Sequence, residues 1–257
     1  MPLFTLCLKM PPSASLQRMV KEAADVLSDY GAEAVEFKVP ELKNIIKDFY
    51  QIMSTDGGNG LKKTIGNQEQ VFQIQNILRF QTMNKLQRFL FSCMLRLLSQ
   101  KTVGEVIIPH AGRISDNQFK NLILKRAEVR EAFLERLDKG QIDILICPPF
   151  ICPALQHDLS VQLSYEGAYG AVFNYLNMPA GVVSLGSVKA SDIKKRLESK
   201  NRVIQTLEKI EKGSIGLPIG VQVAGKLFCE DKVLAVMKVL EEQFKKLEDY
   251  PAGKLCK

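Results

Sequence analysis

Three runs of consecutive apolar residues divide the second half of the chain. They are DILICP (143–148), AGVVSLGSV (180–188) and IGLPIGVQVAG (215–225). Runs of this kind are typical of strands that are buried on both faces. A fourth segment, AVEFKVP (34–40), alternates apolar and charged residues and predicts a half-buried strand.

Apolar residues at three- and four-residue spacing predict helices between these runs. We expect the first helix to begin at Ser13, whose side chain can cap it, and to end near Tyr30-Gly31. A charged stretch, 189–213, is expected to be an excursion on the surface. The alternation of buried strands with amphipathic helices predicts an α/β fold, with a mixed β-sheet covered by helices on both faces in one domain over 1–257. The other helices are expected at 41–53, 116–138, about 166–176 and 228–247.

The segment 71–100 differs from the other predicted helices, and we call it the basic apolar segment. It contains many apolar side chains and four basic residues, and it has no acidic residue. A helix pair lying in a membrane interface has this composition. A buried helical hairpin whose arginines reach water is an equally good interpretation of composition alone. Nucleic-acid binding ranks third, because the basic residues are widely spaced and separated by aliphatic side chains.

The net charge limits the kind of partner that the chain can bind, and the cysteine content indicates the redox state of its compartment. The net charge of +7 and the pI of about 9.0 favour an acidic partner, either nucleic acid or an anionic membrane surface. The six cysteines are scattered without a CxxC pair, which favours reduced thiols. The two histidines, His110 and His157, have no Cys or His at ligand spacing, so we expect no metal and no cofactor. We identify neither a signal peptide nor a transmembrane run.

Five motifs occur in a characteristic order along the chain: MPPSASLQR (10–18), STDGG (54–58), DILICPPFICPAL (143–155), YGAVFNYLNMPAGVV (169–183) and GSIGLPIGVQVAG (213–225). Together they resemble the C-terminal half of the amidase signature family, over residues 10–245. Within that family the chain is most similar to the members that hydrolyse fatty acid amides. The resemblance favours the membrane interpretation of the basic apolar segment, since it lies where those members carry a membrane-binding helical cap.

The resemblance also implies a chemistry, amide hydrolysis by a Ser-Ser-Lys triad. A serine hydroxyl needs a positioned base, and backbone N–H groups must stabilise the oxyanion. No Ser-Ser pair occurs in the chain, and Gly57-Gly58 is its only Gly-Gly pair. We therefore carry over no catalytic residue and expect the triad to lie outside this chain, with the sheet incomplete on its N-terminal side and exposing an edge.

The substrate channel and the cap are the sites that the resemblance implies. It places Ser164, Gly167 and Ala171 on the wall of an acyl channel, with Met53 and Ser54 near the opposite wall. For Gly167 and Ala171, close helix packing is the alternative explanation. The implied membrane cap lies within 71–100, and its expected contact residues are Phe80, Met83, Phe89, Leu90, Met94 and Leu97.

The sequence is compatible with two functions. The first is the C-terminal part of a membrane-associated hydrolase of fatty acyl amides, on the cytoplasmic face and without a transmembrane helix. The second is a catalytically inactive lipid-binding or dimerising module derived from an amidase. Expected partners are a fatty acyl amide or similar lipid and a membrane surface but no nucleic acid, with a homodimer left open.

Overall fold

The computed structural model describes residues 11–97, 103–157, 159, 163, 168–194, 196 and 202–251. Its sheet contains β1 (Ile144–Cys147), β2 (Ala180–Ser187) and β3 (Pro218–Gly225), one from each apolar run, in the order β1-β3-β2. Both pairings are antiparallel, so the predicted mixed sheet is wrong for these residues. The two strands that run in the same direction, β1 and β2, are separated by β3 and cannot form a parallel pair.

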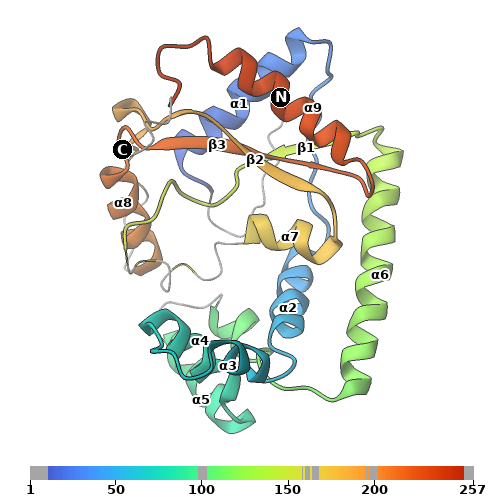
Figure 1. Ribbon diagram of the computed structural model, residues 1–257, viewed down its shortest axis with the longest axis vertical. Coiled ribbons are helices and arrows are strands. Elements are labelled where there is room, and N and C mark those ends of the chain that lie inside the picture. Colours follow the sequence, from blue (N-terminus) through green and yellow to red (C-terminus); the bar gives the residue numbers. More distant parts are fainter. Residues whose placement is uncertain are drawn as a thin grey trace.

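Helices cover both faces of this sheet, as expected. On one face lie α1 (Ala14–Asp29) and α9 (Glu230–Phe244), which Figure 1 shows side by side above the strands. They bury alternate residues of β2 and β3, because successive strand side chains point to opposite faces. The main members of this core are Leu16, Met19, Val20, Val183, Leu185, Ile219, Val221, Val223, Leu240 and Phe244.

The opposite face packs against α7 (Ala168–Leu176), which in turn contacts α2 (Leu42–Met53) and α6 (Asp116–Lys139). Gln222 of β3 is buried on this side, and its Nε2 donates to the Tyr169 carbonyl at 3.2 Å. This bond fixes the sheet to the first turn of α7. The larger core here includes Ile45, Ile46, Phe133, Leu137, Leu145, Cys147, Val172, Phe173, Tyr175, Leu207 and Ile210.

Local signals set the predicted helix ends. Leu16 N donates to Ser13 Oγ at the start of α1, and Gly31 follows its end in the left-handed region at φ +86°. At the start of α6, Ser115 and Gln118 form a reciprocal capping box. These helices therefore begin and end within a residue or two of their predicted bounds.

Two local predictions are corrected. Residues 34–40 contain no strand; instead Phe37 packs edge-on against Phe133 of α6, with ring centroids 5.3 Å apart. In the described part of the chain the sheet consists of β1, β3 and β2, and residues 34–40 pair with none of them. The charged stretch 189–213 contains η3 (Ala190–Asp192) and α8 (Arg202–Gly213), and α8 buries one apolar face. Its buried residues Val203, Leu207 and Ile210 recur at helical spacing, which the many charges concealed.

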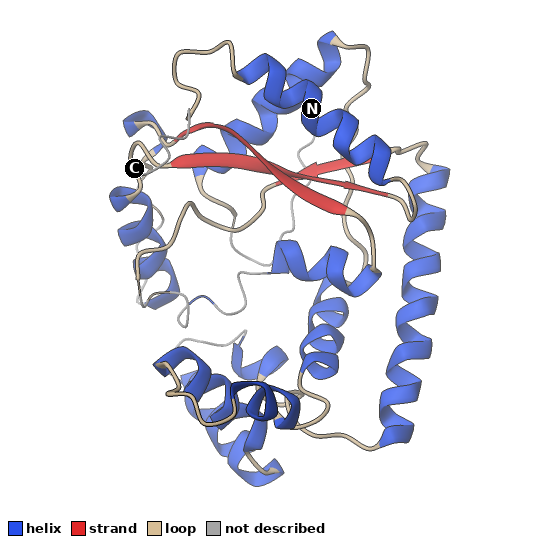
Figure 2. Ribbon diagram, viewed as in Figure 1, coloured by secondary structure: helices blue, strands red, loops and turns tan. Residues whose placement is uncertain are grey.

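The basic apolar segment forms two helices, α4 (Phe72–Thr82) and α5 (Lys85–Leu97), beside the short α3 (Asn59–Ile65). We call α3, α4 and α5 the helical cluster. Figure 2 shows it at the end of the molecule opposite the strands. A π-helical turn, η1 (Val103–Ile107), packs against both α5 and α2 and joins the cluster to the rest of the fold. Within the described residues no helix is both long and apolar enough to cross a bilayer.

Candidate functional site

Helix α5 exposes an apolar face. Leu97 is 86% exposed, Phe89 63% and Leu90 59%. Together with two further exposed residues they recur at three- and four-residue spacing and form one stripe along the helix. We call this stripe the outer face of α5, and its members are Leu86, Phe89, Leu90, Met94 and Leu97.

The other side of α5 is a packed interface. Leu95 and Ser92 are buried, and the Ser92 hydroxyl donates to the carbonyl of Gly104 in η1. The Phe91 ring packs on Phe80 of α4 with centroids 5.4 Å apart. Of the six predicted cap residues, Phe80 and Met83 are therefore half-buried, and the other four belong to the outer face.

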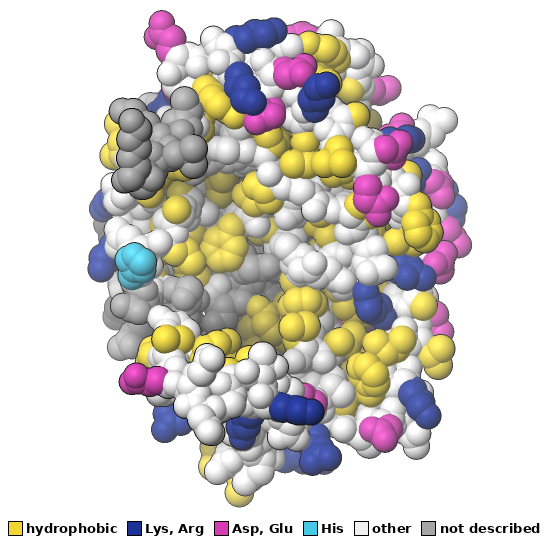
Figure 3. All heavy atoms as spheres, viewed as in Figure 1, with side chains coloured by type: hydrophobic (Ala, Val, Ile, Leu, Met, Phe, Trp, Pro, Cys, Tyr) yellow, Lys and Arg dark blue, Asp and Glu magenta, His cyan; other side chains and the backbone are white. Residues whose placement is uncertain are grey.

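The charged residues of the cluster are mostly exposed and basic. Arg79, Lys85 and Arg96 of α4 and α5 are exposed, and Arg88 is half-buried. Arg96 Nε approaches Glu105 Oε1 at 3.9 Å, which is a loose and solvent-exposed pair. On the face that Figure 3 shows, several dark-blue side chains and a few yellow ones lie at this end of the molecule, among many white atoms. The cluster thus presents apolar and basic side chains together.

Ser54, a predicted channel residue, joins the cluster to the rest of the fold. It is buried; its Oγ donates to the Tyr50 carbonyl at 2.7 Å and accepts from Gly112 N at 2.8 Å. Ile114 N donates to the Thr55 carbonyl at 3.2 Å. The chain therefore enters and leaves the cluster along two hydrogen-bonded segments, one before α3 and one before α6.

Two glycines allow the segment before α3 and the segment before α6 to pack closely against each other and against α5. Gly58 and Gly112 have φ values of +83° and +114°, which favour glycine. A Cβ on Gly112 would lie 2.4 Å from Arg88 Nη1. Asp56 accepts from the backbone N–H groups of Gly60 and Gly58, and these bonds lower the pKa of its carboxyl. The STDGG motif is thus a supporting turn for the cluster.

The remaining predicted channel residues are only partly placed. The Met53 side chain is exposed at the end of α2, and Ala171 is buried in α7, the helix that packs against α2. Ala171 belongs to the core on that face. Ser164 and Gly167 lie outside the described residues.

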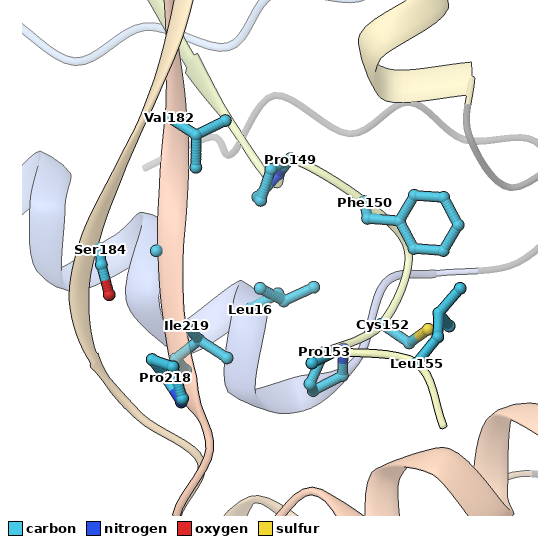
Figure 4. Close-up of a pocket in the computed structure, with 12 residues that line it drawn as sticks. Leu16, Pro149, Phe150, Cys152, Pro153, Leu155, Val182, Ser184, Pro218 and Ile219 are labelled. Atoms are coloured by element: carbon cyan, nitrogen blue, oxygen red, sulfur yellow. The ribbon is translucent and has the colours of Figure 1, made fainter. Parts of the chain in front are cut away.

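Sequence reasoning missed a pocket at the edge of the sheet. Its volume is about 390 Å³, and Figure 4 shows its lining. We call it the sheet-edge pocket. The motif DILICPPFICPAL (143–155), which supplies part of the lining, gave no sign of a cavity. Its lining residues are Leu16, Pro149, Phe150, Cys152, Pro153, Ala154, Leu155, Val182, Ser184, Pro218, Ile219 and Gly220.

Cys147, Cys152 and His157 lie in β1 and in the loop that follows it. Cys147 is fully buried; burial raises the pKa of its thiol, opposed in part by Gln222 Nε2 at 3.6 Å from the sulfur. Cys152 is buried at the pocket wall, and His157 is exposed in the loop beyond it. Across the part of the chain that the structure describes, no three His, Cys, Asp or Glu side chains gather as metal ligands.

Comparison with known proteins decides the family. The family model described as Amidase matches residues 5–234, most of the chain. The chain belongs to the amidase family. The match includes the cluster, the pocket and all three strands of the sheet, so these are parts of an amidase-type domain.

The chain is similar to two proteins of related name. It is 28% identical to "Fatty acid amide hydrolase 1" of Caenorhabditis elegans over 243 residues, which are 90% of this chain and 40% of that protein. A solved structure named "Fatty acid amide hydrolase" superposes with a TM-score of 0.63 at 17% identity, covering 91% of this chain and 38% of the other. The chain thus spans about two fifths of the length of each relative, and the structural match shows a shared fold.

Proposed function

We propose that this amidase chain forms the channel wall and the membrane-facing cap of a hydrolase of fatty acyl amides. Its family and its similarity to two proteins named fatty acid amide hydrolase support the reaction class. The observation that carries the proposal is the outer face of α5 beside the exposed basic residues of the cluster. Five large apolar side chains in one stripe are unusual on a surface that contacts only water.

Apolar burial and charge attraction both favour an interfacial position for the cluster. Full burial of a Leu or Phe side chain is worth roughly 1.5–3 kcal/mol, so five partly exposed ones supply several kcal/mol on entering the acyl region. Each basic residue near an anionic surface adds about 1 kcal/mol. Arg79, Lys85 and Arg96 are exposed on the same two helices, so both contributions act together. The cluster then lies in the interface of the cytoplasmic leaflet without spanning the bilayer.

Within this proposal the chain binds and orients the substrate. A lipid amide delivered through the interface reaches an acyl channel with Met53 and Ser54 on one wall and Ser164, Gly167 and Ala171 on the other. The nucleophile, its base and the oxyanion hole belong to a Ser-Ser-Lys triad outside this chain. Hydrolysis requires all three groups positioned together, so this chain alone is expected to be inactive.

Vesicle flotation tests the membrane part of the proposal. The chain should float with vesicles that contain anionic lipid, and salt should weaken the binding. Leu90→Ser combined with Leu97→Ser should lower binding at least tenfold. The matched control combines Leu124→Ser on α6 with Leu234→Ser on α9, two leucines that are each 64% exposed away from the cluster. Failure of wild type to float, or equal loss in both double variants, contradicts the proposal.

A second candidate is a lipid-binding module without catalysis, which the absence of a Ser-Ser pair from this sequence favours. The two candidates differ in whether the cellular protein that contains this chain also carries a catalytic triad. Native protein immunoprecipitated through an epitope in α6 would be treated with a fluorophosphonate probe and an acyl amide. Labelling and hydrolysis support the hydrolase, whereas membrane binding without either supports the module.

A further inference from the structure

We propose that the outer face of α5 also binds a calcium-loaded EF-hand protein, an acidic partner with a methionine-lined groove, and that this partner releases the chain from membranes. The partner and a membrane exclude each other, because both cover the same five side chains. The release rests on the proposed function, whereas the contact between the two proteins needs no membrane.

The apolar residues of the outer face have the spacing that helix-binding grooves recognise. Such grooves contact apolar residues at positions i, i+3, i+4 and i+7 of one helix. Phe89 and Leu90 follow Leu86 at i+3 and i+4, and Met94 and Leu97 follow Leu90 at i+4 and i+7. Each of the five is at least 42% exposed. The stripe therefore offers two overlapping sets of anchors to one groove.

The charges beside the stripe favour an acidic partner. Residues 71–100 include four basic side chains and no acidic one. Among the described residues, Arg96 is the one member of these four with a carboxylate in ion-pair range, and its Nε lies a loose 3.9 Å from Glu105 Oε1. Arg79 and Lys85 are exposed. An acidic rim around the groove thus meets complementary charge on α4 and α5 and no like charge.

The different shapes of the five anchors favour a groove that adapts. They comprise one aromatic ring, three leucines and one thioether. Methionine-lined grooves repack around such a mixture, because the thioether side chain is flexible and polarisable. Sensor EF-hand proteins expose a groove of this kind when they bind Ca²⁺. The binding should therefore depend on Ca²⁺.

Helix α5 presents one side to a partner, because its other side is fixed to the fold. Leu95 is buried there, and the Phe91 ring packs on Phe80 of α4 with centroids 5.4 Å apart. A partner that wraps completely around the helix would have to break these contacts. A single EF-hand lobe, which covers one face, leaves them intact. We therefore expect one lobe to be sufficient for binding.

Calorimetric titration of the full chain with calmodulin, used as the probe, tests the contact between the proteins. Wild type should bind the probe saturably in Ca²⁺, and a chelator should weaken the binding at least tenfold. One of the two isolated lobes should bind within about tenfold of the intact probe, or about 1.4 kcal/mol. A requirement for both lobes would contradict the one-sided contact.

Matched variants test the location of the contact. Leu90→Ser combined with Leu97→Ser should weaken binding in Ca²⁺ at least tenfold, since it removes two anchors from the face. The control, Leu124→Ser combined with Leu234→Ser, should stay within twofold, because these two leucines are each 64% exposed away from the cluster. Lys85→Glu repeats the test through charge if the first variant fails to fold by circular dichroism, and it should weaken binding at least threefold.

Flotation with anionic vesicles tests the release. Ca²⁺-loaded calmodulin should lower the floated fraction of wild type at least fivefold, whereas Ca²⁺ alone, or calmodulin with the chelator, should leave it within twofold. If wild type does not float, the proposed function and the release fail together, and the titration without vesicles still decides whether the proteins bind. If wild type floats and calmodulin neither binds nor releases it, this inference alone fails.

The contact itself is overturned if wild type shows no saturable binding, if Ca²⁺ and chelator give equal affinity, or if both double variants lose binding equally. A wild-type dimer in sedimentation that Leu90→Ser with Leu97→Ser dissociates would also overturn it. In that case the outer face of α5 would be covered by a second copy of the chain.

Discussion

Similar apolar sequences have opposite environments in two regions of the molecule. One region is the sheet with its two helical layers, and the other is the helical cluster. In the sheet region, β3 is buried from Ile219 to Gly225, and the apolar faces of α1 and α9 close over it. In the cluster, α5 buries Leu95 on one side and leaves its outer face open. Apolar periodicity predicts a helix in both places, but only the neighbouring elements decide whether the apolar side chain reaches protein or solvent. The outer face of α5 therefore has the apolar composition of a surface that binds a partner.

The largest expected effect is the difference between one buried leucine and one exposed leucine. Leu185→Ala in β2 removes a side chain that is 0% exposed and should lower the free energy of unfolding by about 2–5 kcal/mol. Leu97→Ala in α5 makes the same chemical change and should stay within about 0.5 kcal/mol. Urea unfolding followed by circular dichroism measures both. Equal losses would show that the outer face of α5 is packed within the protein in solution.

The next effect concerns charge in the same two regions. In the sheet region Arg18 donates to both carboxylate oxygens of Asp192 at 2.8 Å and to the Ser187 carbonyl at 2.9 Å, and the Asp192 side chain is 7% exposed. Arg18→Gln leaves that carboxylate without its counter-charge and should cost about 2–4 kcal/mol. Arg96→Gln removes a loosely paired, exposed arginine and should cost at most about 0.5 kcal/mol. A reversed order would contradict the picture of a packed sheet region and an open cluster.

The Arg18 pair also predicts a pH dependence. Burial alone would raise the pKa of Asp192, but hydrogen bonds from Arg18 and from Lys189 N outweigh it and hold the pKa below its ordinary value. The unfolded chain then binds a proton before the folded one as the pH falls. Wild type should therefore lose stability below about pH 4, the ordinary Asp range, and Arg18→Gln should show a shallower decline. Parallel wild-type and variant curves from pH 6 to pH 3 would exclude this assignment.

A smaller and more local effect is expected where the cluster joins the fold. Ser54→Ala leaves the Gly112 N–H without its acceptor and should cost about 1–3 kcal/mol. Hydrogen exchange should quicken across 54–58 and 110–115 with little change in the strands. Thr55→Val is the control, because its hydroxyl donates only to the carbonyls of Gln51 and Ile52, and no N–H loses an acceptor. Quicker exchange throughout the sheet would show that the two regions do not open separately.

The sequence predicted the elements of both regions better than their surroundings. The period of α1 and the caps at Ser13 and Ser115 are local signals, so those helices were placed closely. The three apolar runs predicted three strands, but their antiparallel order depends on which strand lies between the other two, and no residue pattern encodes that. Phe37 illustrates the same limit, since an alternating segment becomes a strand only beside another strand. The buried face of α8 was concealed by its charges.

The candidate sites show the same difference between features set by local sequence and features set by distant contacts. The outer face of α5 follows from composition and helical spacing, so Phe89, Leu90, Met94 and Leu97 could be named from the sequence. The role of Ser54 as a hydrogen-bonded joint depends on Gly112, which is 58 residues away. The sheet-edge pocket depends on three distant segments meeting at Leu16, Phe150 and Ile219. The spacing of nearby residues does not predict contacts between residues that are far apart in the sequence. These contacts were identified from the structure.

One measurement tests the central claim, that the outer face of α5 lies in a lipid interface. The sequence contains no tryptophan, so Phe89→Trp creates a single reporter on that face and Leu234→Trp a single reporter on α9. Both begin exposed to water. On addition of vesicles with anionic lipid, the emission of Phe89→Trp should move to shorter wavelength and become resistant to an aqueous quencher, while that of Leu234→Trp should not change. An unchanged Phe89→Trp spectrum, or the same shift in both variants, would contradict the account.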